Sequence, residues 1–224
     1  MPISEVYNCD CLEYMRSLPD KYFDLCIADP PYGIGVDGQK SCVCKNSKHN
    51  RKEHIRKKWD SHIPCLDVFT EMMRVSKHIV LWGANYFVKY LSESHKGWIC
   101  WYKGQTGLTM SDCELAYTNF DVPTRVIEIN RCALAKEKTI HPTQKPIALY
   151  SWILDNYAMG GGKIFDPFLG SGSSRIAAYK KGYDFYACEL DKDYYDAQED
   201  RFRRECFGEI KTNDGKVVTN LSLF

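Results

Sequence analysis

Short apolar runs alternate along the chain with amphipathic segments of helical period. The apolar runs are bounded by turn signals, and they predict buried strands at residues 6–11, 23–28, 78–83, 98–102, 114–117, 125–129, 163–165 and 185–188. Apolar positions three and four residues apart predict helices at 12–18, 67–75, 146–157 and 174–181. Because strands alternate with helices, we expect an α/β fold built on a parallel sheet.

The run at 23–28 leads directly into Asp29-Pro30-Pro31-Tyr32, and a glycine-rich turn follows at 33–35. The tetrapeptide therefore lies at the carboxyl end of a strand, the edge where open α/β sheets bind ligands. Two prolines remove two backbone donors and fix φ, which leaves a rigid cluster of acceptors around the Asp29 carboxylate. Such a cluster suits an NH₂ group, and Tyr32 offers a face on which a planar ring can stack. The alternative is a structural turn with a buried tyrosine.

A second informative stretch, Asp166-Pro167-Phe168-Leu169-Gly170-Ser171-Gly172-Ser173, lies between a predicted strand and a predicted helix. This is the arrangement of the first unit of a nucleotide-binding fold. Asp166 would repel a phosphate but attract a cation, and Glu189 follows about twenty residues later, where an acid typically binds ribose hydroxyls. A ribose that bears a positive group fits S-adenosylmethionine. A structural glycine turn is the alternative.

Composition is that of one globular domain, with 44% hydrophobic and 26% charged residues among 224. We therefore expect a single domain over residues 1–224. The start of the sequence does not resemble a targeting segment and no apolar run is long enough to cross a membrane, so a cytoplasmic protein is expected. The eleven cysteines are odd in number and several lie in apolar runs, which argues against disulfides. Cys42 and Cys44, with His49 and His54, lack the spacing of common zinc sites, so no metal is expected.

The net charge of +1 conceals an asymmetry. Residues 40–58 contain eight Lys and Arg against Glu53, whereas residues 184–200 contain seven acids against Lys192. A local basic stretch matters more for phosphate contacts than the net charge does. The stretch lies in a long aperiodic segment, which in compact domains is usually functional or disordered. We expect a basic nucleic-acid-binding loop at about 36–60, with a solvated loop as the alternative.

These motifs together resemble those of the β-class DNA amino-methyltransferases, the group that includes restriction-associated, orphan and phage adenine enzymes. Asp29-Pro30-Pro31-Tyr32 resembles the catalytic motif, residues 166–172 the cofactor motif, and His141-Pro142-Thr143-Gln144-Lys145-Pro146 the segment before it. The resemblance implies a Rossmann-like S-adenosylmethionine-dependent methyltransferase fold, with a mostly parallel twisted sheet and helices on both faces. The motif order is circularly permuted, and the two motif strands are expected to be neighbours. The resemblance covers residues from about 6 to 203 and is thin at 36–59 and 104–137.

The resemblance also implies residue roles. Asp29 and the Pro30 carbonyl would accept hydrogen bonds from the adenine amine, which would attack the sulfonium methyl directly, and Tyr32 would stack on the flipped base. Asp166 would bind the methionine ammonium and Glu189 the ribose. The segment at 143–145 would hold the methionine carboxylate, although Lys145 could instead face solvent; Asp10 would lie near the cofactor adenine or cap a helix. The expected catalytic residues are Asp29, Pro30, Pro31 and Tyr32, and the expected cofactor-binding residues are Asp10, Asp29, Thr143, Gln144, Lys145, Asp166, Phe168, Gly170, Ser171, Gly172 and Glu189.

The implied substrate is the N6 amine of adenine in double-stranded DNA, with a small target-recognition segment at about 104–140. The expected phosphate contacts are Lys45, Lys48, Arg51, Lys52, Arg56, Lys57, Lys58, Arg125 and Arg131. Cytosine-N4 enzymes of the family usually begin the catalytic motif with Ser, so Asp29 favours adenine, and cytosine-N4 stays an alternative. RNA adenine methylation and a non-catalytic nucleic-acid-binding module are further alternatives. Relatives are often dimers, which leaves a homodimer open; no membrane partner is expected.

Overall fold

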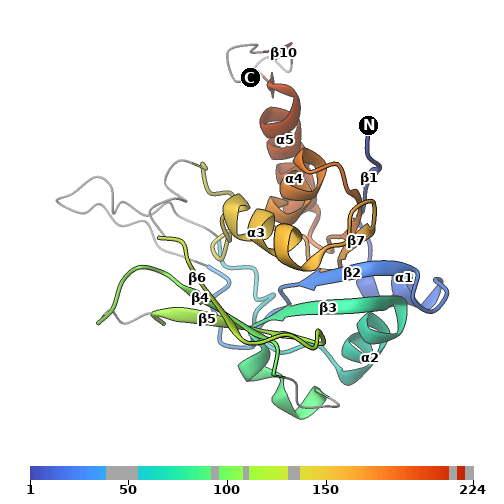
Figure 1. Ribbon diagram of the computed structural model, residues 1–224. Helices are drawn as coiled ribbons and strands as arrows, with labels where there is room; N and C mark the ends of the chain where they lie inside the picture. The colour runs from blue at the N-terminus through green and yellow to red at the C-terminus, as the bar shows by residue number, and fades with distance from the viewer. Residues whose placement is uncertain (39–54, 92–95, 108–110, 131–136, 212–215, 220–224) are drawn as a thin grey trace.

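The computed structural model describes residues 1–38, 55–91, 96–107, 111–130, 137–211 and 216–219 (Figure 1). Its elements, in chain order, are β1 (Ser4–Tyr7), α1 (Cys11–Arg16), β2 (Phe23–Ala28), α2 (Leu66–Val75), β3 (Ser76–Trp82), the 3-10 helices η2 (Ala84–Tyr86) and η3 (Val88–Tyr90), β4 (Trp98–Tyr102), β5 (Cys113–Thr118), β6 (Arg125–Glu128), α3 (Ile147–Tyr157), β7 (Lys163–Asp166), α4 (Ser173–Lys180), β8 (Asp184–Cys188), α5 (Lys192–Phe207), β9 (Glu209–Lys211) and β10 (Val217–Thr219).

Eight of these strands form one sheet in the order β1-β8-β7-β2-β3-β5-β4-β6. The first five strands in this order run parallel to their neighbours, β5 runs antiparallel to both β3 and β4, and β6 pairs parallel with β4. The two motif strands are paired, with Leu25 of β2 opposite Ile164 of β7. The mostly parallel sheet and the adjacency of the two motif strands are therefore confirmed.

Helices cover both faces of the sheet, so its central strands are buried almost continuously. Along β2, Leu25 and Ile27 pack with residues of α3 and α4, whereas Cys26 and Ala28 pack with residues of α1 and α2. Figure 1 shows α3, α4 and α5 above the sheet and α2 below it. The helices on both faces expected from the sequence are confirmed.

Most predicted elements agree with the structure to within two residues at each end, but one predicted strand needs correction and one long helix was missed. The first strand is Ser4–Tyr7 and not 6–11, because Asp10 accepts hydrogen bonds from the backbone of Leu12 and Glu13 and begins a helix. Helix α5 was not predicted. Its buried face consists of Tyr194, Gln198, Arg201 and Phe202, and two polar residues in four weaken the apolar period.

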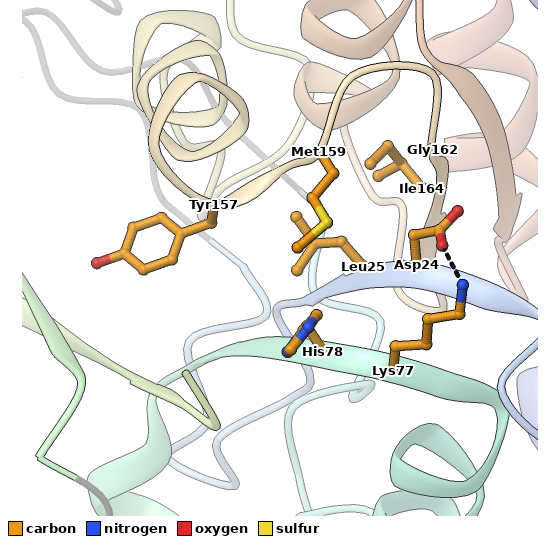
Figure 2. Close-up of a pocket in the computed structure, with 8 residues that line it drawn as sticks. All are labelled: Asp24, Leu25, Lys77, His78, Tyr157, Met159, Gly162 and Ile164. Carbon is orange, nitrogen blue, oxygen red and sulfur yellow. Dashed lines mark hydrogen bonds and ion pairs between the residues drawn. The ribbon is translucent and has the colours of Figure 1, made fainter. Parts of the chain in front are cut away.

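At the amino end of β2, far from the motif residues, Asp24 pairs with Lys77 of β3 at 2.6 Å (Figure 2). His78, Met159 and Tyr157 help to line a small cavity beside this pair. The described residues contain no metal-ligating cluster and no helix long and apolar enough to cross a membrane. Cys26 and Cys188 are free thiols, and the Cys42 and Cys44 segment lies outside the described residues.

Candidate active site

Three carboxylates lie at the ends of three neighbouring strands. Asp29 follows β2, Asp166 ends β7 and Glu189 follows β8. The carboxyl ends of parallel strands meet at one edge of a sheet, and this edge is the ligand-binding edge of open α/β folds. Residues that are more than a hundred positions apart in the chain are therefore brought to one site.

Asp29 is held by two side chains at the end of β2. The Tyr32 hydroxyl donates a hydrogen bond to its Oδ1 at 2.6 Å, and the Lys145 ammonium forms an ion pair with its Oδ2. Burial raises the pKa of Asp29 above its ordinary value, although Lys145 acts in the opposite direction. The Lys145 side chain is only 3% exposed, so the solvent-facing alternative for this residue is wrong.

A second carboxylate, which the sequence did not single out, contacts the same ammonium. Glu114 on β5 places Oε2 at 3.1 Å from Lys145 Nζ and Oε1 at 2.8 Å from Lys103 Nζ. Burial opposes ionisation of Glu114, but the two lysines prevail and lower its pKa to about 2. In the sequence Glu114 is one polar position in a short strand pattern, which carries no sign of a charge network.

The Tyr32 ring is held by the turn that follows β3. It stacks on Tyr86 with ring centroids 5.0 Å apart and planes inclined by 16°, and Phe87 contacts it edge-on at 5.9 Å. Gly83 has φ +67°, and a Cβ at this position would lie 2.1 Å from the Tyr32 ring. The turn can therefore accommodate Tyr32 only with glycine at position 83.

Asp166 is buried without a cation beside it among the described residues. Its Oδ1 accepts a hydrogen bond from the Phe168 backbone N–H at 3.0 Å, and its Oδ2 accepts one from the Ser174 hydroxyl at 2.5 Å. Burial raises the pKa of Asp166 to about 7. A buried carboxylate with only neutral donors is suited to a ligand ammonium, so this part of the site fits S-adenosylmethionine.

The glycine-rich loop is fixed from two sides. Glu189 accepts hydrogen bonds from the backbone N–H groups of Gly170 and Asp191, each at 2.8 Å, and burial raises its pKa. From α5, the buried Arg201 guanidinium donates to the Ser171 carbonyl at 2.7 Å and pairs with Glu137 at 2.9 Å. The loop is thus held in place before any ligand binds.

The remaining predicted cofactor residues surround this loop or begin the neighbouring helices. Gly172 precedes α4, and a Cβ there would lie 3.2 Å from Gln198. Thr143 is exposed, whereas Gln144 is buried and accepts a hydrogen bond from the Ile140 N–H at 3.1 Å. Asp10 caps α1, as the alternative for this residue expected. A contact of these residues with the cofactor stays a prediction.

The N6_N4_Mtase profile, which describes a DNA methylase, matches residues 45–200. The chain belongs to this DNA methylase family. The type II methyltransferase M.HinfI of Haemophilus influenzae is 23% identical to this chain over a gapped alignment of 265 positions, which covers 96% of this chain and 71% of the relative. S-adenosylmethionine, predicted above from the sequence, is confirmed as the cofactor of this DNA methylase. Asp29 to Tyr32 precede the matched residues, and their catalytic role stays a prediction.

Two solved structures share the fold. The protein TTHA0409 from Thermus thermophilus, solved with S-adenosyl-L-methionine, superimposes with a TM-score of 0.60 at 16% identity and covers 91% of this chain and 94% of that one. The PvuII DNA methyltransferase, which is cytosine-N4-specific, superimposes with a TM-score of 0.58 at 13% identity, with 91% and 93% covered. The profile that matches this chain is named for both N6 and N4 methylation, so membership in the family does not choose the base.

The basic stretch of this DNA methylase is described only at its carboxyl end. Lys45, Lys48, Arg51, Lys52 and Arg131 lie outside the described residues. Arg56 pairs with Asp37 at 3.1 Å, and Lys57 pairs with Asp191 at 2.6 Å and Asp193 at 2.7 Å. Lys58 and Arg125 are exposed. Lys57 therefore joins the end of the basic stretch to the start of α5, two residues after Glu189.

Proposed function

We propose that this DNA methylase transfers a methyl group to the N6 amine of adenine in double-stranded DNA, with the base rotated out of the duplex. The observation that carries the proposal is the position of Asp29. It is a largely buried carboxylate followed by two residues without backbone donors, one strand away from the buried Asp166. An exocyclic amine held by Asp29 would therefore lie beside a cofactor held by Asp166.

The chain's residues divide the binding between them. S-adenosylmethionine, when bound, supplies a methyl group activated by a sulfonium. Asp166 would hold the ammonium and Glu189 the ribose. Gly170 and Gly172 would let the backbone approach closely, and Phe168 and Ser171 would pack against the cofactor. Thr143 and Gln144, before α3, would hold the carboxylate.

Asp29 supports the chemistry by accepting hydrogen bonds. Each carboxylate oxygen has a second lone pair beyond the one used by Tyr32 or Lys145, so the amine can still be bound. Asp29 and the Pro30 carbonyl orient the amine so that its nitrogen forms the new bond to the methyl carbon as the sulfur–carbon bond breaks. Asp29 then takes the proton that the methylated nitrogen must lose, and no covalent enzyme intermediate is required.

Target recognition would come from the segment at about 104–140. Strands β5 and β6 of this segment belong to the main sheet, and the loops joined to them begin beside Lys103 and after Glu128, at the edge where Asp29 lies. These loops and the basic stretch at 36–60 would contact the duplex on either side of the flipped base. The cytoplasmic location and the homodimer stay predictions.

The test is methyl transfer from labelled S-adenosylmethionine to unmodified duplex DNA, followed by nucleoside digestion and identification by mass. N6-methyladenine that disappears in Asp29→Ala is the expected result. If N4-methylcytosine forms instead, the proposed mechanism holds but the target base is cytosine and not adenine. Transfer to RNA but not to DNA would overturn the substrate, and cofactor binding without any methylated nucleoside would favour the non-catalytic alternative.

A further inference from the structure

Four charged side chains of alternating sign form a continuous row that ends at the catalytic carboxylate. The row runs Lys103, Glu114, Lys145 and Asp29, with contacts of 2.8 Å and 3.1 Å at its first two steps and an ion pair at the third. Its members come from the end of β4, from β5, from the segment before α3 and from the end of β2. The Lys103 side chain is 12% exposed, Glu114 23% and Lys145 3%, so solvent screens the row weakly.

We propose that Glu114 is a positioning residue for methyl transfer: it holds the Lys145 ammonium against Asp29 and divides the charge of that ammonium between two carboxylates. The inference rests on the proposed function, because it assigns the environment in which Asp29 accepts the amine. It adds a residue that contacts neither base nor cofactor and acts through Lys145.

The reason is a balance that a single ion pair would not provide. A carboxylate paired alone with a buried ammonium is a weak proton acceptor, because protonation would leave the ammonium without a counter-charge. A carboxylate in the same site with no ammonium would be harder to ionise, because burial raises its pKa and nothing would lower it in return. Glu114 places Asp29 between these limits, and Lys103 in turn keeps Glu114 ionised.

The other groups around Asp29 do not supply this balance. Tyr32 donates its hydroxyl to Asp29, and burial raises the pKa of this phenol well above its ordinary value, so it stays neutral. Tyr150 of α3 is a second buried phenol whose pKa is raised in the same way. Asp166 on β7 is a further acid near Asp29, and its hydrogen bonds come from Phe168 and Ser174 of the glycine-rich loop and α4.

The proposal predicts pH shifts of opposite sign. Asp29 must be ionised to accept the amine proton, so activity falls as the pH drops through its pKa. Glu114→Gln keeps the shape but removes a negative charge, so the acid limb of kcat should move to lower pH by about half a unit to one unit. Lys145→Met removes the positive charge, so the limb should move to higher pH by about one unit or more. Lys103→Met strengthens the pull of Glu114 on Lys145 and should give a smaller upward shift.

The experiment measures kcat against pH for these variants and for the wild type, with saturating DNA and S-adenosylmethionine. The matched control is Asp24→Asn, which removes an acid from the same strand at its far end, where it pairs with Lys77 (Figure 2). This control should leave the acid limb in place. An independent readout is a ¹³C NMR titration of the Asp29 carboxyl carbon in the free protein, assigned by its absence in Asp29→Asn.

Opposite shifts for Glu114→Gln and Lys145→Met, in both readouts, would support the role of Glu114. Shifts in the same direction would overturn the role of Glu114, and so would an acid limb of Glu114→Gln that coincides with that of the wild type. The proposed function would still hold in either case, because the methylated product is still formed. If the wild type forms no methylated nucleoside, the proposed function fails. The NMR titration then still decides whether Glu114 and Lys145 oppose each other at Asp29.

Discussion

Asp166 shows how a residue proposed to bind the cofactor can oppose folding. It is 2% exposed, and its hydrogen bonds come from a backbone N–H and a hydroxyl. Its pKa is raised from 3.8 to about 7, so the folded protein holds this proton more tightly than the unfolded chain does. The contribution of Asp166 to stability is therefore present at low pH and is lost as the pH rises from about 4 to about 7.

Asp166→Asn should stabilise the protein at pH 8 and abolish tight cofactor binding. The amide removes the buried charge that destabilises the wild type at high pH. The difference in free energy of unfolding between the variant and the wild type should therefore be larger at pH 8 than at pH 5, by roughly 1–3 kcal/mol. Urea unfolding at the two pH values measures this difference, and calorimetry measures S-adenosylmethionine binding. A variant that is less stable at pH 8, or that binds the cofactor as well as the wild type, would contradict this role.

The sequence could single out Asp166 as a candidate cofactor-binding residue, because an acid at a strand end beside a glycine turn is a local pattern. The contacts of Lys145 were not predictable in the same way. Its segment indicated a helix start, but its burial against Asp29 depends on how the segment before α3 lies over the end of β2. Glu114 is further removed from any local pattern, because its position follows from β5 running antiparallel to β3.

At the scale of elements, the turn after β3 determines where the Tyr32 ring lies. Gly83 accepts the left-handed conformation and leaves the space that the ring fills, and η2 then brings Tyr86 against the ring. The predicted strand ended at this glycine, but the sequence did not indicate that the turn contacts the catalytic motif. That contact requires β2 and β3 to be neighbours, which only the sheet order shows.

Gly83→Ala should reduce methyl transfer, whereas Gly161→Ala should not. Both glycines have positive φ, so each substitution should cost about 1 kcal/mol of stability. A Cβ at Gly161 meets nothing within 4 Å, while one at Gly83 requires the Tyr32 ring to move. We expect kcat to fall roughly tenfold or more only in Gly83→Ala, because a displaced ring misplaces the base. Equal kcat values in the two variants, measured beside urea unfolding, would show that Tyr32 is not needed in this position.

Helix α5 has clear sequence signals at its ends but not along its length. Its ends carry clear signals, an Asp191 cap at the start and Gly208 with φ +67° after the end. Between them, the polar residues on the buried face weaken the apolar period that would have predicted a helix. Arg201 is buried there because it binds the carbonyl of Ser171 and the carboxylate of Glu137. A charged residue thus occupies a core position, where it holds the glycine-rich loop at 166–173.

At the scale of the whole molecule, the basic stretch at 40–58 and the acidic stretch at 184–200 form ion pairs with each other. Lys57, from the basic stretch, is 23% exposed and lies between Asp191 and Asp193, from the acidic stretch. Its ammonium also lies 4.7 Å from the Tyr194 ring centroid. The average charge of the chain hides this pairing, and so does the sequence, since 134 residues separate Lys57 from Asp191. Lys57 therefore holds the end of the basic stretch against the start of α5, beside the proposed cofactor site.

This division gives neighbouring lysines different effects on DNA binding. A lysine that neutralises a phosphate releases a counterion. The slope of log affinity against log salt is negative, and removing such a lysine lowers its magnitude by about one. Lys58 is exposed, and Lys58→Met should lower the slope in this way and weaken binding to all sequences alike. Lys57 is already neutralised by two carboxylates, so Lys57→Met should leave the slope nearly unchanged.

Fluorescence anisotropy with one labelled duplex, from about 50 to 200 mM salt, compares these slopes directly. The slope is a sharper readout than the affinity, because either substitution removes one positive charge and weakens long-range attraction equally. If Lys57→Met lowers the slope instead, Lys57 must leave Asp191 and Asp193 when DNA binds. The basic stretch would then separate from α5 in the complex, and its contact with the cofactor side would belong to the free protein alone.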